Sequence, residues 1–510
     1  MKYFIPAWYA QNQWWQDRAR PYYDDVHTKT EFDDMVSIMG MHYKNDNPFK
    51  MIILNHFTDL RSFLYRNQLF ECDYWSVFDE IQGFKNMTPQ AIDYRDLDWP
   101  EHTEFVYTPY LIRSITSNDT YSHIHYSNMG YLIWIEDFKD DVKTHRYVFD
   151  DRGMLSSVEV YDDGELAYSQ LISVKGDVVL TEYTAGEVMI ASAYQSQFKQ
   201  TSYSSMVELI EERLQLYLEN VSQEQIIAAA HYHHNKLINR VVSGKNLTYC
   251  IFTKRNRIIQ QDELIEMQHA SHWVVDTQDN EAILATVKPE GMLRITPFNT
   301  QALPSLSSQL YETYIGVNID GLDAERLNAL IDLLIDFVVE NEQMKIVLMT
   351  RESLSNYHYL TEKVEAINDR FIAEADTLGL FNEEDTEKAK VIQLVSLPFE
   401  NDVIKKIAEL RIVIDLNQEP DLFLQICAIS AGIPQINMRA TDYVEDNING
   451  MIIHDDDDGI TLALNYYLLV LKHWNASLAY NMKLTKKYAS INIINQFDRF
   501  IKGEAYEKEI

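Results

Sequence analysis

The feature that most constrains this 510-residue chain is a regular alternation of short apolar runs and longer amphipathic runs from about residue 310 onward. The short runs are predicted strands and the long runs are predicted helices, because apolar residues recur in them with different periods. Strands alternating with helices of this length specify a doubly wound parallel sheet, in which ligands bind beyond the carboxyl ends of the strands. The predicted strands are 314–319, 346–349, 391–395, 412–416, 435–437 and 451–453, and the predicted helices are 327–340, 353–378, 402–410, 421–431 and 460–472.

A different pattern occupies residues 106–199, where short runs alternate apolar and polar residues and Asp/Gly turns separate most of them. This pattern is typical of an antiparallel meander with one packed face and one solvated face. Before it, Met51–Leu54 reads as a buried parallel strand. After it we expect helices at 205–219 and near 225–239, followed by strands at 247–252 and 272–276.

These patterns predict an α/β protein with two Rossmann-like lobes and an antiparallel sheet inserted into the first lobe. We expect residues 1–105 and 200–300 to form the N-terminal lobe and 106–199 to form the inserted sheet. Residues 301–480 would form the C-terminal lobe, and 481–510 a helical segment that packs back on the N-terminal lobe.

Charge and composition exclude several classes of function. Lys and Arg total 44 against 78 Asp and Glu, a formal charge of −34, which disfavours nucleic-acid binding. The three cysteines have no metal-ligand spacing and indicate a reducing compartment. The N-terminus does not read as a signal peptide, and no apolar run approaches the roughly 20 residues that span a bilayer. We therefore expect a cytoplasmic protein.

Two clusters of basic residues are the candidates for contact with an anionic membrane. The alternative is that both clusters are ordinary solvated charges on a surface of mixed sign. The clusters are Lys254, Arg255 and Arg257, and Lys483, Lys486 and Lys487.

The most informative stretch runs from Arg411 to Asp458 and resembles the donor half of the retaining GT-B glycosyltransferases. The matching residues are Glu419, the turn Ala431-Gly432-Ile433-Pro434, Glu445 and the hairpin Asn449-Gly450. In that family a strand ends in a Glu–Gly–Phe–Gly-like turn, a second Glu follows eight positions after the first, and a small-Gly-x-Pro turn leads to the next strand. The resemblance implies a GT-B fold and covers the second lobe best.

Several departures from that family predict a defective donor site. The second Glu, which holds the nucleotide ribose in the family, falls on Cys427, and a thiol is a weak donor and a weak acceptor. Pro420-Asp421-Leu422 replaces Gly–Phe–Gly, so Pro420 offers no N–H and Asp421 adds negative charge at a helix start that we expect to include Pro420. The alternative is an active enzyme with unusual contacts. The Arg and Lys that neutralise the leaving diphosphate in the family have no clear counterparts here, and the candidates are Arg351 and either Lys388 or Lys390.

Trp8, Trp14 and Trp15 stand where the family usually has a glycine-rich loop. These rings could form an aromatic platform for a carbohydrate, or they could simply pack in a core or an interface. His231 and His234 would share a helix face, but no acidic residue lies one turn away, and ordinary polar packing is the simpler interpretation. We expect no catalytic residues, no metal and no cofactor.

The segment Lys2–Tyr9, the inserted meander and the degenerate donor turn together resemble the glycosyltransferase-like member of the accessory Sec export proteins of Gram-positive bacteria. The resemblance spans essentially the whole chain. It implies a non-enzymatic protein in a complex with two partner proteins, which binds an O-glycosylated serine-rich-repeat adhesin and delivers it to a dedicated SecA-type motor. It also implies affinity for phospholipids, and hence peripheral association with the membrane.

Three functions therefore remain open at this point. The first is a non-catalytic export factor that binds glycan and polypeptide on a GT-B scaffold. The second is an active retaining glycosyltransferase that acts on Ser/Thr-rich protein. The third is a purely structural subunit with no preference for glycosylated cargo.

Overall fold

The computed structural model describes residues 1–504 except 10–12, 18, 24–33, 86, 222–223, 253–260, 289, 302, 305, 377–389 and 455–456. The chain divides into two compact units, which are considered separately. Unit 1 contains residues 1–28, 42–275 and 284–293, and unit 2 contains 29–41, 276–283 and 294–510. Where the structure describes helices, none is long and apolar enough to cross a membrane.

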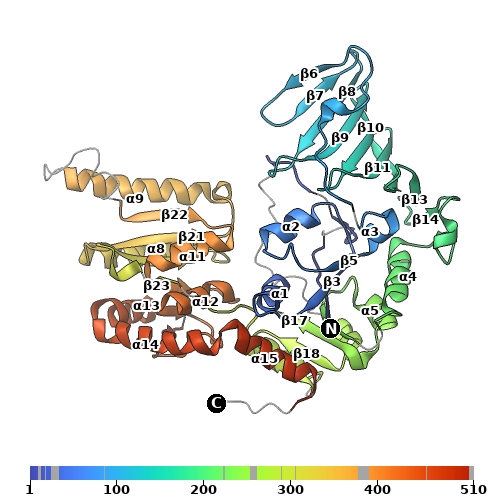
Figure 1. Cartoon of the computed structure of the whole chain (residues 1–510). Helices are drawn as coiled ribbons and strands as arrows, with labels where there is room; N and C mark the ends of the chain where they lie inside the picture. Colours follow the sequence, from blue (N-terminus) through green and yellow to red (C-terminus); the bar gives the residue numbers. More distant parts are fainter. Residues whose placement is uncertain are drawn as a thin grey trace. The chain divides into compact units, whose positions relative to one another are not determined.

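Unit 1 is built on a largely parallel sheet in the order β19-β18-β17-β16-β1-β3-β5 (Figure 1). These strands are rich in apolar residues, as expected for a parallel sheet whose two faces are both covered by helices. The strands are β1 Lys2–Ile5, β3 Phe49–Ile53, β5 Tyr74–Ser76, β16 Gln225–Ala229, β17 Leu247–Ile251, β18 His272–Val275 and β19 Met292–Arg294. The helices that lie wholly in unit 1 are α2 Leu60–Arg66, α3 Val77–Gln82, α4 Met206–Leu218, α5 Asn235–Val241 and α6 Gln261–Met267. Two others, α1 Asp34–Lys44 and α7 Gln278–Ala285, fall mostly in stretches assigned to unit 2.

One helix predicted from the sequence is wrong. Residues 225–229 form strand β16, and the helix α5 begins only at Asn235. The apolar run Ile226–Ala230 is buried next to β1 and β17, so pairing within the sheet overrides its helical composition. This correction places the histidines 231, 233 and 234 in the loop after a strand, not on a helix face.

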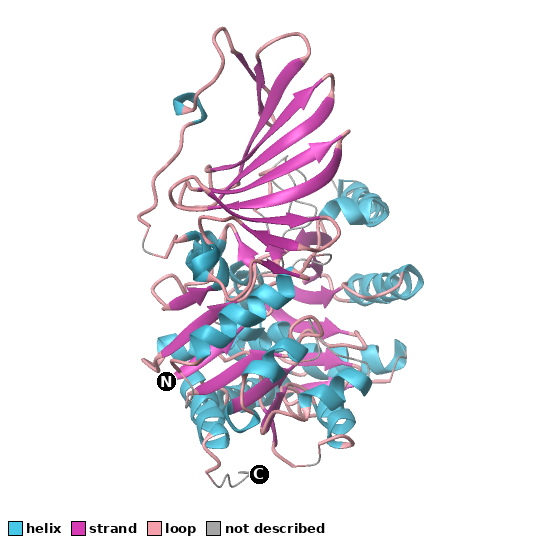
Figure 2. Ribbon diagram, turned by 90° about the vertical axis from the view of Figure 1, so that its right-hand side faces the viewer, coloured by secondary structure: helices cyan, strands magenta, loops and turns pink. Residues whose placement is uncertain are grey.

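The inserted sheet is an antiparallel meander whose strands run from β6 to β15 in chain order. Figure 2 shows it as a strongly twisted sheet. Its inner apolar face packs against residues 92–105, with Ile124 and Ile135 at the centre of that cluster. The strands are β6 Glu104–Tyr107, β7 Ile112–Ile115, β8 Thr120–Tyr126, β9 Leu132–Lys139, β10 Val142–Phe149, β11 Leu155–Asp162, β12 Glu165–Ile172, β13 Val178–Tyr183, β14 Val188–Ile190 and β15 Ser202–Tyr203.

Unit 2 is a second parallel sheet, in the order β22-β21-β20-β23-β24-β25. The alternation read from the sequence is confirmed here, with strand ends shifted by one or two residues. The strands are β20 Thr313–Asn318, β21 Met344–Thr350, β22 Ile392–Ser396, β23 Leu410–Asp415, β24 Gln435–Asn437 and β25 Gly450–Ile452. The helices are α8 Ala324–Glu340, α9 His358–Asp376, α11 Glu400–Glu409, α12 Leu422–Ala431, α13 Asp457–Leu464, α14 Leu471–Lys487 and α15 Ser490–Ile501.

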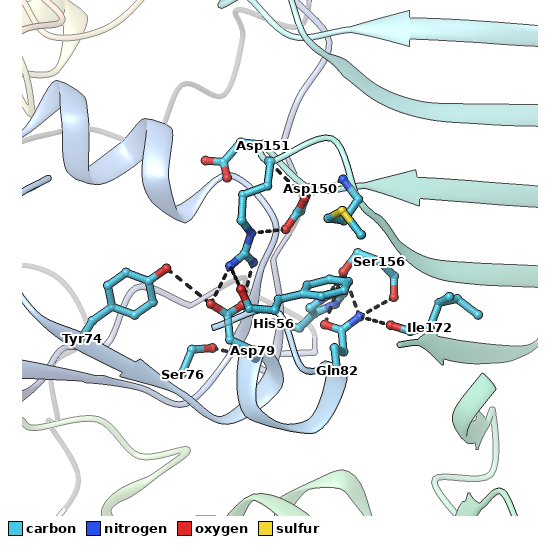
Figure 3. A network of polar contacts seen from close by, with 12 residues as sticks. His56, Tyr74, Ser76, Asp79, Gln82, Asp150, Asp151, Ser156 and Ile172 are labelled. Carbon is cyan, nitrogen blue, oxygen red and sulfur yellow. Dashed lines mark hydrogen bonds and ion pairs between the residues drawn. The ribbon is translucent and has the colours of Figure 1, made fainter. Parts of the chain in front are cut away.

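A buried ion-pair network joins the inserted sheet to the α/β lobe of unit 1, that is, to its parallel sheet and helices (Figure 3). Arg152, in the β10–β11 turn, donates to both carboxylate oxygens of Asp79 in α3, at 2.7 and 2.8 Å. The same guanidinium donates to Asp150 at 2.6 Å. Beside it, the Gln82 amide donates to the carbonyl oxygens of Ser156 and Ile172, at 2.7 and 2.8 Å. The network therefore fixes the two neighbouring hairpins of the meander to one helix of the lobe.

Replacing Arg152 by Met should destabilise the protein strongly. The variant keeps most of the side-chain volume but leaves Asp79 and Asp150 buried without their cation, which typically costs about 3–5 kcal/mol. Urea unfolding followed by circular dichroism measures this loss. The matched control is Arg95→Met, because Arg95 makes its ion pair with Asp93 at the exposed surface. Equal unfolding midpoints for the two variants would contradict a structural role for the network.

Asp151, next to Arg152, should make stability depend on pH. Burial raises the pKa of its carboxyl to about 7, although the N–H of Ser62 donates to it at 2.6 Å. An unfolded Asp titrates near 3.9, so the folded chain binds this proton more tightly, and the resulting stabilisation disappears as the pH rises through about 7.

The substitution Asp151→Asn removes this titration and keeps an oxygen for Ser62. The stability of the variant relative to the parent protein should therefore increase by about 2 kcal/mol between about pH 5 and about pH 7. Urea unfolding at both pH values gives this difference. Asp163→Asn, at an exposed turn of the next hairpin, is the control and should show no such trend. A difference for Asp151→Asn that is independent of pH would show that the carboxyl titrates normally.

Candidate functional site

The carboxyl edge of the sheet in unit 2 is where a doubly wound fold binds its ligands. The strand order reverses between β20 and β23, and the crevice at such a switch point is the expected site. Three polar side chains end the strands there: Asn318 on β20, Asp415 on β23 and Asn437 on β24. All three are buried. The site is therefore polar, as a ligand site would be, but closed to solvent.

Asp415 organises this edge by accepting hydrogen bonds from its own neighbours. Its Oδ1 accepts from the side-chain amides of Asn318 and Asn417, at 3.3 and 2.7 Å. Its Oδ2 accepts from the backbone N–H of Asp421 at 2.8 Å. A buried carboxylate with this many donors is fully satisfied. The carboxylate of Asp415, which could otherwise contact a ligand at the switch point, is thus hydrogen-bonded to other groups of the chain.

The helix start that follows is filled in the same way. Asp421 is the N-cap of α12, and its Oδ1 accepts from the N–H of Leu424 at 3.0 Å. Its Oδ2 forms an ion pair with Arg351 at 3.0 Å. A helix N-terminus and a nearby guanidinium are the two groups that would hold a diphosphate. Here a carboxylate of the chain occupies both.

A second acid holds the backbone of Arg351 on the opposite side. The N–H of Arg351 donates to Asp320 at 2.8 Å, and the Thr350 hydroxyl donates to the other oxygen of the same carboxylate. Burial raises the pKa of Asp320, although these hydrogen bonds and the charge of Arg351 oppose the shift. The backbone of Arg351 is therefore held by one carboxylate while its guanidinium pairs with another, that of Asp421.

The space remaining at this edge is small. The cavity between Asn318, Thr350, Arg351, Asp421 and Leu424 has a volume of about 10 Å³. That is room for about one water molecule, whereas pockets for small-molecule ligands usually measure about 300 Å³ or more. A nucleotide could enter here only if the Arg351–Asp421 ion pair opened.

The other residues predicted for the donor site lie in different environments. Glu419 is exposed, and Pro420 is half-buried and precedes the N-cap, so the expectation that Pro420 begins the helix is wrong. Cys427 lies inside α12 and is only 3% exposed, and burial raises the pKa of its thiol. A side chain at this position packs in the core of unit 2. Lys390 is half-buried, and Lys388 lies outside the described residues.

The switch point of unit 1 is also occupied by the chain's own side chains. It lies between β1 and β16, and the segments that leave these strands carry Tyr9 and His234. The Tyr9 hydroxyl donates to Nδ1 of His234 at 2.6 Å, and Nε2 of His234 donates to the carbonyl of Ala229, also at 2.6 Å. Burial lowers the pKa of His234 to about 4, so the ring is neutral at physiological pH. The polar packing predicted for this histidine is confirmed.

The three tryptophans near this point are mostly buried. Trp8 is 6% exposed and packs against Phe63, with ring centroids 4.7 Å apart, and Trp14 is 2% exposed. Trp15 is half-buried, and its Nε1 donates to Glu182 of the inserted sheet at 3.4 Å. Burial of Trp8 and Trp14 supports packing, the other interpretation that the sequence left open. A carbohydrate platform stays a prediction, with Trp15 as its most accessible ring.

Sequence reasoning missed the residues that fill the edge in unit 2. Asn318, Asp320 and Asp415 were not singled out, although each stands at or directly after the end of a predicted strand. That position was the available signal, since the carboxyl ends of parallel strands meet at one edge. Attention to the helix start identified Asp421 and Arg351, which the structure brings together.

The comparisons with known proteins agree on one family. The sequence profile described as accessory Sec system protein 1, the first of the Asp proteins of that system, matches residues 1–505. A curated relative of the same description from Staphylococcus aureus (strain NCTC 8325 / PS 47) is 43% identical over 517 residues, covering 99% of each chain. Accessory secretory protein 1, 2 and 3 of Streptococcus pneumoniae were solved together, and one chain of that structure matches with 28% identity and a TM-score of 0.81, covering 99% of each chain.

A more distant match concerns the fold alone. The pneumococcal O-GlcNAc transferase GtfA, solved with UDP and GlcNAc, aligns over 99% of each chain with a TM-score of 0.70 at 11% identity. The predicted α/β, GT-B-like fold with an inserted antiparallel sheet is therefore confirmed. Taken with the profile match and the identity over nearly the full length, these findings show that this chain belongs to the family of accessory Sec system protein 1.

Proposed function

We propose that this accessory Sec protein is not an enzyme and that it binds O-glycosylated serine-rich-repeat adhesin on its way to the membrane translocase. One observation carries the non-catalytic part: the Asp421 carboxylate accepts from the N-terminus of α12 and pairs with Arg351. These are the groups that a sugar nucleotide would need for its diphosphate. A transferase would have to break this contact in every catalytic cycle.

The proposed partners follow from the family and from its solved relatives. A pneumococcal relative was solved with accessory secretory proteins 2 and 3, so we propose that this chain assembles with two other accessory Sec proteins. We further propose delivery of the adhesin to a dedicated SecA-type motor, from a cytoplasmic pool that associates peripherally with the membrane.

Lys483, Lys486 and Lys487 are the candidate contact with phospholipid. They are exposed in the last turns of α14 and so can face an anionic surface together. The other basic cluster, Lys254, Arg255 and Arg257, lies outside the described residues.

The first test asks whether the internal carboxylate excludes a diphosphate. Calorimetry should detect no binding of UDP-GlcNAc or inorganic pyrophosphate to the native protein. The variant Asp421→Asn keeps an N-cap acceptor but frees the charge of Arg351, so measurable pyrophosphate affinity should appear. Asp323→Asn is the matched control, because Asp323 caps α8 in the same way with its oxygen 2.8 Å from the N–H of Arg326.

Two results would contradict the proposal. Binding of UDP-GlcNAc by the native protein, followed by sugar transfer to a Ser/Thr-rich peptide, would support the alternative of an active retaining glycosyltransferase. Pyrophosphate binding that is equally weak in Asp421→Asn and Asp323→Asn would show that Asp421 does not stand in for a phosphate.

The second test separates a cargo-binding subunit from a purely structural one. The purified complex with its two partner proteins is presented with the same adhesin segment in glycosylated and bare form. We expect the glycosylated form to be retained and the bare form to be retained several-fold less, as measured by biolayer interferometry. Equal retention of both forms would favour the structural subunit.

A further inference from the structure

A row of charged and polar side chains crosses one face of the inserted sheet. The register sets Arg113 opposite His123, His123 opposite Glu136, and Glu136 opposite Arg146 on four successive strands, β7 to β10. Directly opposed residues of antiparallel strands have side chains in contact. His125 lies two residues beyond His123 on β8, and therefore on the same face. Two imidazoles and one carboxylate are thus brought together by strand pairing alone.

The ligand atoms of His123, His125 and Glu136 all lie within 4.8 Å of one another. Nε2 of His125 faces Oε2 of Glu136 at 3.3 Å, yet it makes no hydrogen bond of acceptable geometry. In a tetrahedral site with metal–ligand bonds of about 2.0–2.1 Å, two ligand atoms stand about 3.3 Å apart. The separation of His125 and Glu136 therefore matches that of two ligands of one ion.

Hydrogen bonds to neighbouring residues already orient two of the three side chains. Oε1 of Glu136 accepts from Nε and Nη2 of Arg146, at 3.0 and 2.7 Å, which leaves Oε2 directed at His125. Nδ1 of His125 is hydrogen-bonded to the Tyr23 hydroxyl at 3.0 Å. Metal-binding histidines and carboxylates usually carry such outer partners, because these fix the ring and its tautomer.

Some charged side chains near the three ligands would repel a bound cation, and others would attract it. Lys143 lies 3.5 Å from Oε1 of Glu136, and Arg113 lies opposite His123. Arg146 is shared with Glu159, at 3.3 Å, which offsets part of its charge. The carboxylate oxygen nearest these cations is Oε1, not the oxygen that faces the histidines. A site here would bind with modest affinity that neighbouring charges control.

We propose that His123, His125 and Glu136 form a binding site for a zinc ion on the face of the inserted sheet, independent of the function proposed above. Two imidazoles and a carboxylate are a zinc ligand set, whereas magnesium and calcium prefer oxygen ligands throughout. Three protein ligands leave a fourth position for solvent. The ion would link β8 to β9 and so stiffen the half of the meander farthest from the Arg152 network.

The test uses the full chain, treated with EDTA and then dialysed against metal-free buffer. Calorimetry with zinc chloride should give one equivalent bound, and magnesium chloride should give no heat of binding. Cobalt(II), used as a spectroscopic substitute for zinc, should produce the intense visible absorption of a four-coordinate ion. His123→Gln and His125→Gln should each abolish both signals, while His145→Gln, on the neighbouring strand β10, should keep them. Melting temperatures measured in EDTA confirm that each variant is folded. Of the two histidines, His123 is the less buried, so its substitution disturbs the fold less.

Two further variants locate the ion. Lys143→Gln removes a like charge near the ion and should tighten zinc binding. Tyr23→Phe removes the outer contact of His125 and should weaken binding about 10-fold. If folded His123→Gln binds zinc as His145→Gln does, or if Lys143→Gln leaves the affinity unchanged, the assignment is wrong.

Discussion

The contact of Asp421 with both Arg351 and the start of α12 governs what the second sheet can bind. A parallel sheet with helices on both sides exposes unpaired backbone donors at its carboxyl edge, and in most such folds a ligand completes them. Here the completing group is a carboxylate of the chain itself, and its backbone N–H donates to Asp415 at the end of β23, the strand before α12. An external anion would have to compete with that carboxylate for the same donors.

The same principle operates in unit 1. At its switch point the neutral His234 and the hydroxyl of Tyr9 complete each other and the backbone of β16. Trp14 packs against Tyr9, with ring centroids 4.6 Å apart. Both sheets thus carry polar groups where a ligand would lie, and in both several of these groups have internal partners: Asp415 and Asp421 in unit 2, and Tyr9 and His234 in unit 1. Buried donors and acceptors are usually paired, and these contacts meet that need without an external ligand.

The inserted sheet depends on the first lobe through a different contact. Arg152 shares its charge between Asp79 of the lobe and Asp150 of the meander, so neither element satisfies it alone. The far half of the sheet instead has its own polar row around Glu136, which the proposed ion would complete. The sheet is thereby anchored to the lobe by side-chain charges at the turn between β10 and β11.

How much the sequence determined can be argued from particular residues. The alternation after residue 310 predicted the strands of unit 2 to within one or two residues and the order of its helices, with helix ends up to eight residues off, because periodicity records which side of an element is buried. The resemblance to the donor half of the GT-B glycosyltransferases, not the periodicity, led to Asp421 and Arg351. The periodicity was wrong for 225–229, where two neighbouring strands imposed a strand on a run of residues that read as helical.

What the sequence alone decided is therefore the class of fold, the position of the meander and the absence of the family's second Glu at Cys427. Only the tertiary structure decided that Asp421 turns toward Arg351, 70 residues away, and that His123, His125 and Glu136 converge. The physical reason is that periodicity is a local property of one element, whereas the pairing of charges depends on which strands become neighbours. That choice is made when the whole sheet forms.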